Sequence, residues 1–172
     1  DPQASADELE RAVSRLGLRG AMLFANVNGQ PIHHREYWPL YETAERLDVP
    51  LMIHPTSPPG VEAFQEYRTT ALVGFVMDTT LAITLLVFEG VLEKYPRLKL
   101  VLSHLGGTIP YISERIDRGY DAYPEVRKNI SHHPSYYFKR CYFDTVAFYP
   151  NALRFAIDYA GAERVTVAAG PL

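Results

Sequence analysis

The sequence predicts an α/β fold in which helices cover both faces of a parallel sheet of about five strands. Helical patterns and short apolar runs alternate along all 172 residues, and these runs are continuous rather than alternating in polarity. Such runs are typical of parallel strands, which are buried on both faces and joined by helices. Polar side chains also collect where the runs end, which is where parallel sheets carry their ligand sites.

The first part of the chain contains two helix–strand units. Residues 7–16 space their apolar side chains for one helical face and end at Gly17, a typical residue for a helix C-terminus. The run 20–27, GAMLFANV, is the first predicted strand. Residues 35–47, REYWPLYETAERL, predict a helix, and residues 50–54, PLMIH, predict the second strand.

The remainder of the chain continues the alternation. Residues 78–95 predict a long apolar helix that is capped by Asp78 or Thr79 and stopped by the proline after it. The strand 98–104 follows, and a proline opens the helix that covers 111–120. After an irregular, tyrosine-rich stretch come the strand 140–146, the helix 151–161 and the strand 164–169.

Composition and charge exclude several classes of function. The net charge is −3 with Lys and Arg scattered, which argues against a nucleic-acid partner or a membrane surface. The single cysteine excludes an internal disulfide framework and fits a reducing compartment. No apolar run is expected to reach the roughly 20 residues that span a bilayer. The polar N-terminus does not resemble a signal peptide. We therefore expect a cytoplasmic protein.

Two histidines each end a predicted buried strand: His54 in VPLMIHPTSPPG and His104 in KLVLSHLGGTIP. Adjacent parallel strands lie about 4.8 Å apart, so two such imidazoles can point into one cavity. Neutral imidazole binds zinc and similar metals, and it also exchanges a proton near neutral pH. The alternative is that each histidine only bonds a loop carbonyl at the end of its strand, and the pattern alone leaves both interpretations open.

The loops beyond these histidines favour a ligand site. Gly106 and Gly107 lack a Cβ, so the backbone there can approach a ligand closely. The stiff, proline-rich PTSPP segment after His54 can form the rim of a pocket. No G-x-G-x-x-G or P-loop pattern follows any predicted strand, which disfavours a nucleotide site.

The segments LMIHPTSPP, YFDT and GAERV, and above all the block 72–120, resemble the amidohydrolase-related metal enzymes. The similar branch is that of aminocarboxymuconate-semialdehyde decarboxylase and the resorcylate-type decarboxylases. The resemblance implies that residues 1–172 form a single domain, the C-terminal part of a longer (β/α)8 barrel of the TIM-barrel type. It also implies a divalent metal at the carboxyl ends of the strands and assembly into a homo-oligomer.

The resemblance assigns roles to three residues. His54 matches a metal-ligand histidine, and His104 matches a histidine that hydrogen-bonds the metal-bound water and acts as acid and base. Arg115 matches an arginine that in some decarboxylases binds a substrate carboxylate in a neighbouring subunit's site, although a solvated surface arginine is the alternative. The metal expected is zinc, with manganese as the alternative.

The sequence departs from this family in its metal ligands. The H-x-H pair of the family's first strand has no counterpart, because the adjacent pairs in IHH, residues 32–34, and SHHP, residues 131–134, are interpreted as surface histidines. VAAGPL, residues 167–172, lacks the metal-binding aspartate of the family's last strand, and Asp144 is not a substitute for it on family grounds. The chain is therefore expected to be truncated at both ends, and the metal can be absent from it.

The function expected is that of a metal-dependent decarboxylase. Its substrate would be a small molecule, an unsaturated or aromatic carboxylic acid, and His104 would control the protonation of that molecule. Two alternatives remain open. One is a metal-dependent hydrolase of an ester, lactone or amide, and the other is a catalytically inactive barrel fragment that lacks most of the metal ligands.

Overall fold

The structure, a computed structural model, describes residues 1–168 and confirms the predicted parallel sheet. Its five strands lie in the order β1-β4-β5-β6-β7, and each neighbouring pair is parallel. Their bounds are β1 (Ala21–Phe24), β4 (Leu51–His54), β5 (Leu100–Leu102), β6 (Tyr142–Asp144) and β7 (Val165–Thr166). Of the described part of the predicted strand 164–169, only Val165–Thr166 form β7, and residue 169 lies outside the described residues.

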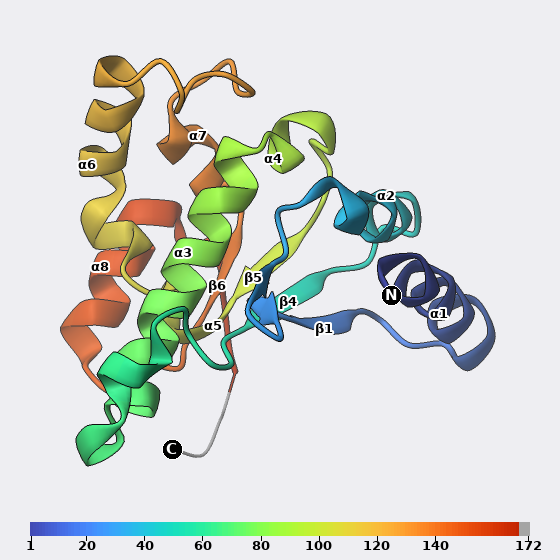
Figure 1. Cartoon of the computed structure of the whole chain (residues 1–172), viewed down its shortest axis with the longest axis horizontal. Coiled ribbons are helices and arrows are strands. Elements are labelled where there is room, and N and C mark those ends of the chain that lie inside the picture. The colour runs from blue at the N-terminus through green and yellow to red at the C-terminus, as the bar shows by residue number, and fades with distance from the viewer. Residues whose placement is uncertain (169–172) are drawn as a thin grey trace.

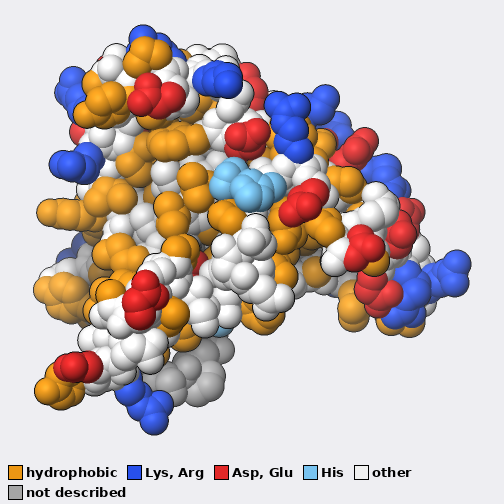
Figure 2. All heavy atoms as spheres, viewed as in Figure 1, with side chains coloured by type: hydrophobic (Ala, Val, Ile, Leu, Met, Phe, Trp, Pro, Cys, Tyr) orange, Lys and Arg blue, Asp and Glu red, His pale blue; other side chains and the backbone are white. Residues whose placement is uncertain are grey.

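Helices connect these strands, as the alternating pattern predicted (Figure 1). Figure 1 shows α1 and α2 together beyond the β1 edge, α3 beside β6, and α6 and α8 on the far side of α3 from the strands. Figure 2 shows side chains of both charge signs interspersed over α1 and α2 on this face. The helices are α1 (Pro2–Leu16), α2 (Trp38–Arg46), α3 (Phe75–Phe88), α4 (Val91–Lys94), α5 (Ser103–Gly106), α6 (Ile109–Ala122), α7 (Pro134–Phe138) and α8 (Pro150–Ala160).

The first predicted strand is shorter than expected, because the chain turns back on itself after β1. Residues Asn26–Val27 form β2, which pairs antiparallel with β3 (Gln30–Pro31). Asn28 and Gly29 connect them with φ of 52° and 76°. Positive φ at both positions is what a tight hairpin turn requires, and Asn-Gly is the dipeptide that supplies it most easily. This dipeptide was a sequence signal that the strand prediction overlooked.

The long helix predicted over 78–95 begins earlier and is interrupted. A π-helical turn, Thr70–Gly74, leads directly into α3, so Asp78 lies inside the helix and does not cap it. Gly90 ends the helix with φ of 86° before α4 begins. A Cβ at Gly90 would lie 2.6 Å from the carbonyl oxygen of Asn129, so the turn there is tightly packed.

The early start of this helix also corrects the expectation about apolar length. The stretch Glu66–Phe88 has 23 residues and contains an 18-residue window with a mean hydropathy of 2.1, so by length and composition it could cross a membrane. In this fold it covers the sheet instead. Ile83, Leu86 and Val87 are fully buried and belong to the same hydrophobic cluster as Leu51 and Leu100 of the strands, which is the arrangement of a core helix.

Replacement of Leu86 by alanine tests this packing. The side chain is completely buried in the cluster, so Leu86→Ala is expected to lower the free energy of unfolding by about 2–5 kcal/mol. Leu81 lies on the same helix but is 42% exposed, and Leu81→Ala is the matched control, with an expected loss below about 1 kcal/mol. Equal losses in urea-induced unfolding of the two variants would contradict the orientation of α3.

Candidate functional site

The carboxyl ends of β4, β5 and β6 gather the candidate site at one edge of the sheet. His54 is the last residue of β4 and Asp144 is the last residue of β6, while His104 follows β5 by two residues. The centroids of the His54 and His104 rings lie 6.0 Å apart, with their planes tilted by 58°. The structure therefore brings the two predicted histidines together.

The His54 ring is held by the residue that follows it. Its Nδ1 atom lies 2.8 Å from the carbonyl oxygen of Pro55. Because a carbonyl oxygen can only accept a hydrogen bond, Nδ1 carries the proton in this contact. The neutral ring then keeps its lone pair on Nε2, the arrangement in which metal-ligating histidines are commonly held. His54 is thus chemically suited to donate Nε2 to a metal ion.

The prediction that His104 ends a strand is wrong, because β5 stops at Leu102 and His104 lies in a tight turn. His104 and Leu105 have φ of 56° and 53°, and the two glycines after them have φ of 73° and 67°. The short element α5 is therefore a turn with left-handed residues rather than a regular helix. A left-handed conformation costs a residue with a side chain about 1–2 kcal/mol, and such strain is concentrated at functional sites.

Neighbouring elements hold this turn in place. The N–H of Leu105 donates to Oδ1 of Asp144 at 3.1 Å, and the N–H of Thr108 donates to Oγ1 of Thr80 at 2.8 Å. The hydroxyl of Ser103 donates to a carbonyl of β4 at 2.8 Å. The turn is thus bonded to β6, to α3 and to β4, which makes its unusual backbone conformation part of the packed sheet edge.

The His104 imidazole itself is poorly bonded. Its Nδ1 atom is buried and has no hydrogen-bond partner among the described residues. Burial lowers the pKa of His104 below its ordinary value; the Asp144 carboxylate opposes this and the His54 ring adds to it. An imidazole nitrogen without a hydrogen-bond partner can exchange a proton with a bound molecule.

A second buried network fixes the loop after His54. The Asp78 carboxylate accepts a hydrogen bond from Nδ2 of Asn26 at 3.1 Å and another from the N–H of Thr56 at 2.9 Å. Sequence reasoning missed this network, because Asp78 was interpreted as a helix cap. The loop lines one side of a cavity of about 360 Å³ that neither His54 nor His104 lines, so the PTSPP rim of their site stays a prediction.

The described residues do not by themselves form a complete metal centre. Among residues 1–168, no group of three or more His, Cys, Asp or Glu side chains lies close enough to hold an ion. Oδ1 of Asp144 already accepts two backbone N–H groups, from Leu105 and Val146. The segment VAAGPL, in which the family's metal-binding aspartate is absent, lies partly outside the described residues, since these end at residue 168.

Arg115 makes no hydrogen bond or ion pair with His54 or His104. It lies in α6 with an exposed side chain, and it makes no hydrogen bond or ion pair with another described residue. Its role at a neighbouring subunit's site stays a prediction.

Of the four histidines interpreted as surface residues, three are exposed: His34, His132 and His133. His33 is only half-exposed, and its Nδ1 atom is buried without a partner among the described residues, so the interpretation was incomplete there.

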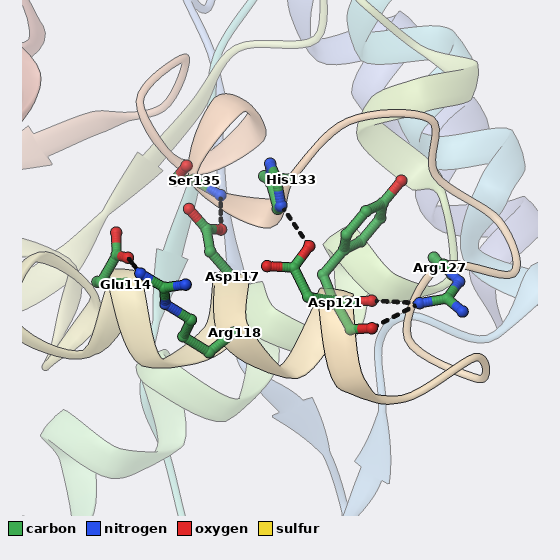
Figure 3. A network of polar contacts seen from close by, with 8 residues as sticks. Glu114, Asp117, Arg118, Asp121, Arg127, His133 and Ser135 are labelled. Atoms are coloured by element: carbon green, nitrogen blue, oxygen red, sulfur yellow. Dashed lines mark hydrogen bonds and ion pairs between the residues drawn. The ribbon is translucent and has the colours of Figure 1, made fainter.

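His133 belongs to a polar network that joins α6 to the segment before α7 (Figure 3). Its Nε2 atom lies 2.9 Å from Oδ1 of Asp121, and the N–H of Ser135 donates to Oδ1 of Asp117 at 2.9 Å. Arg127 donates to the backbone carbonyl of Asp121 at 2.9 Å. These contacts anchor the loop on α6, so His133 of the SHHP segment has a structural role remote from the sheet edge.

Comparison with known proteins identifies the relatives of this arrangement. The family model described as Amidohydrolase matches residues 1–166. The 2-amino-3-carboxymuconate-6-semialdehyde decarboxylase of Dictyostelium discoideum is 31% identical over 96% of this chain and 46% of its own length. The gamma-resorcylate decarboxylase of Polaromonas sp. is 33% identical over 96% of this chain and 55% of its own length. The chain thus spans about half the length of these relatives.

Solved structures share the fold. The 5-carboxyvanillate decarboxylase of Sphingomonas paucimobilis matches with a TM-score of 0.90 and 29% identity, over 98% of this chain and 52% of that one. A dihydroxybenzoic acid decarboxylase of Polaromonas sp., solved with manganese and 2-nitroresorcinol, matches with a TM-score of 0.85 and 31% identity, over 98% and 55%. The five-stranded sheet is therefore a portion of a TIM barrel, as the sequence predicted.

The turn that carries His104 can be tested by adding a methyl group to it. A Cβ at Gly106 would lie 2.6 Å from the buried Phe143 ring, whereas a Cβ at Gly29, with nearly the same φ, would meet nothing within 4 Å. Gly29→Ala is expected to cost about 1 kcal/mol of unfolding free energy from backbone strain alone. Gly106→Ala is expected to cost about 1–3 kcal/mol more from the clash. Equal losses in chemical denaturation would contradict the close packing of the turn on β6.

The His133 network predicts a dependence of stability on pH. The Asp121 hydrogen bond raises the pKa of His133 above its ordinary value, with Asp117 and Glu114 contributing. Since the folded state holds the proton more tightly, this stabilisation is complete below about pH 6.5. It is lost as the pH rises through the folded pKa. An NMR titration of the His133 ring measures that pKa directly, and Asp121→Asn should lower it; no change in that variant would refute the assigned cause.

Proposed function

Because the chain belongs to the amidohydrolase family, we propose that it supplies the acid–base residue of a metal-dependent decarboxylase that acts on an aromatic carboxylic acid. One observation supports this above the others: the two imidazoles that meet 6.0 Å apart at the carboxyl edge of the sheet. The names of the relatives support the substrate class, because they include decarboxylases of aminocarboxymuconate semialdehyde, gamma-resorcylate and 6-methylsalicylic acid.

The proposed reaction moves one proton and breaks one carbon–carbon bond. The protonated His104 ring gives its proton to the ring carbon that bears the carboxylate, and the neutral imidazole is left behind. The bond to the carboxylate then breaks, its electron pair returns to the aromatic ring, and carbon dioxide leaves. A proton from water restores the ring for the next turnover.

We propose His54 as one ligand of a divalent ion, because its Nδ1 contact with Pro55 leaves Nε2 free. The ion is zinc, with manganese as the alternative that relatives solved with manganese support. Residues 1–168 do not complete its coordination, so the proton transfer above is assigned to His104 alone.

The remaining expectations are proposals of the same kind. Arg115, exposed on α6, would bind a substrate carboxylate at the site of a neighbouring copy, which makes the working protein a homo-oligomer. The scattered charges and the buried, unpaired Cys141 support a cytoplasmic setting with a small-molecule substrate and without a nucleic-acid or membrane partner.

Separate substitutions of the two histidines test the assigned roles. In the intact protein, His104→Ala is expected to lower kcat for the release of carbon dioxide from 2,6-dihydroxybenzoate by about 10²–10⁴-fold. It should leave the metal content of the purified protein nearly unchanged, whereas His54→Ala should lower that content. The exposed His132→Ala variant is the control and should change neither quantity. Equal metal loss in the His54 and His104 variants would contradict the division of roles, and a wild-type protein without metal or turnover would favour the inactive-fragment alternative.

A further inference from the structure

The turn that presents His104 cannot be explained by its own bonds. His104 and Leu105 both occupy the left-handed region, with φ of 56° and 53°, and each pays a conformational cost there. Within the turn, the N–H of Gly107 donates to the carbonyl oxygen of His104 at 3.0 Å. A single bond of this kind contributes about 0.5–1.5 kcal/mol, which is less than the strain of two such residues. Contacts from outside the turn must therefore keep His104 in this conformation.

Asp144 supplies such a contact from the neighbouring strand. The carboxylate is buried, with only 2% of the residue exposed, and its Oδ1 atom lies 3.1 Å from the N–H of Leu105. The same oxygen accepts the N–H of Val146 at 3.1 Å, so the carboxylate is tied to its own strand end as well.

The strand that carries Asp144 is itself well fixed and touches the turn directly. Asp144 pairs with Thr166 of β7, and Phe143 before it pairs with Leu102 of β5. The Phe143 ring fills the space beside Gly106, because even one added carbon atom there would lie 2.6 Å from it. The end of β6 therefore limits the turn in two ways, by a hydrogen bond to Leu105 and by close packing against Gly106.

We propose that Asp144 is a positioning residue of the site, whose carboxylate holds the Leu105 N–H and thereby keeps the His104 imidazole facing His54. This proposal rests on the proposed role of His104 as the acid–base residue. Asp144 would touch neither the substrate nor a metal ion, in keeping with the sequence interpretation that it is not a replacement metal ligand. Its effect passes through the backbone of the turn, so the acceptor oxygen matters more than the negative charge.

Two variants distinguish the effect of the Asp144 acceptor oxygen from the effect of its negative charge. Asp144→Asn retains an oxygen at the Oδ1 position and removes the charge, whereas Asp144→Ala removes both. In the intact protein, with 2,6-dihydroxybenzoate as the probe, Asp144→Ala is expected to lower kcat by about 10²-fold, the cost of misplacing a catalytic group by about 1 Å. KM should change little, and Asp144→Asn should keep kcat within about threefold of wild type. An Asn variant as impaired as the Ala variant would overturn the proposal, because the charge would then be what matters.

Hydrogen exchange provides a test that needs no activity. The Leu105 amide, followed by mass spectrometry of a peptide that covers residues 103–108, is expected to be protected in the wild type and in Asp144→Asn. It should exchange at least about tenfold faster in Asp144→Ala, because its acceptor is gone. Asp78→Ala is the matched control, since Asp78 is equally buried and holds the N–H of Thr56 instead. It should leave the exchange of the Leu105 amide unchanged.

These readouts separate the failure of this proposal from the failure of the proposed function. If the wild type releases no carbon dioxide, the exchange of the Leu105 amide still decides whether Asp144 holds the turn. If Asp144→Ala does not fold, the wild type and Asp144→Asn remain decisive. An unprotected Leu105 amide in the wild type, or loss of its protection in Asp144→Asn, would overturn the proposal.

Discussion

The parallel register of β4, β5 and β6 is the constraint on which the candidate site depends. Ile53 lies opposite Leu102, and Leu102 lies opposite Phe143, so the three strands end at the same level of the sheet. A polar residue follows each of these positions within two residues: His54, His104 and Asp144. Hydrophobic burial below the edge fixes the register of β4 and β5, because their side chains alternate between buried and half-buried and a slip by one residue would exchange the two sets. The core therefore determines which polar groups meet at the edge.

At that edge the backbone is strained and the polar groups are incompletely paired, whereas the core beneath is not. His104 and Leu105 adopt left-handed conformations, and Nδ1 of His104 is buried without a partner among the described residues. Both features cost free energy, which the contacts of the turn with β4, β6 and α3 offset. An acid–base group that is held in place before a substrate arrives does not lose conformational freedom during the reaction, which is the advantage of such preorganisation.

Sequence reasoning was sufficient where local pattern decides the structure and insufficient where distant residues decide it. Continuous apolar runs predicted the strands, and His54 ends its strand as expected, since the run LMIH continues to the end of β4. The backbone of His104 was not predictable, because its positive φ depends on Asp144, which follows it by 40 positions in the chain. Asp78 was misassigned for a similar reason: its partner Asn26 lies on a distant hairpin. Only that hairpin, with its Asn-Gly turn, carried a local signal that could have been read.

We propose that the two imidazoles face one space and have different roles, with His54 binding a metal ion and His104 transferring protons. Diffraction at the zinc absorption edge, from crystals of the intact protein grown with zinc, tests it most directly. We expect a zinc ion about 2.1 Å from Nε2 of His54, with the His104 ring near the ion but outside its coordination sphere. An ion bound by His104 and not by His54 would contradict these roles. Two rings turned away from each other, with no shared space, would contradict them as well.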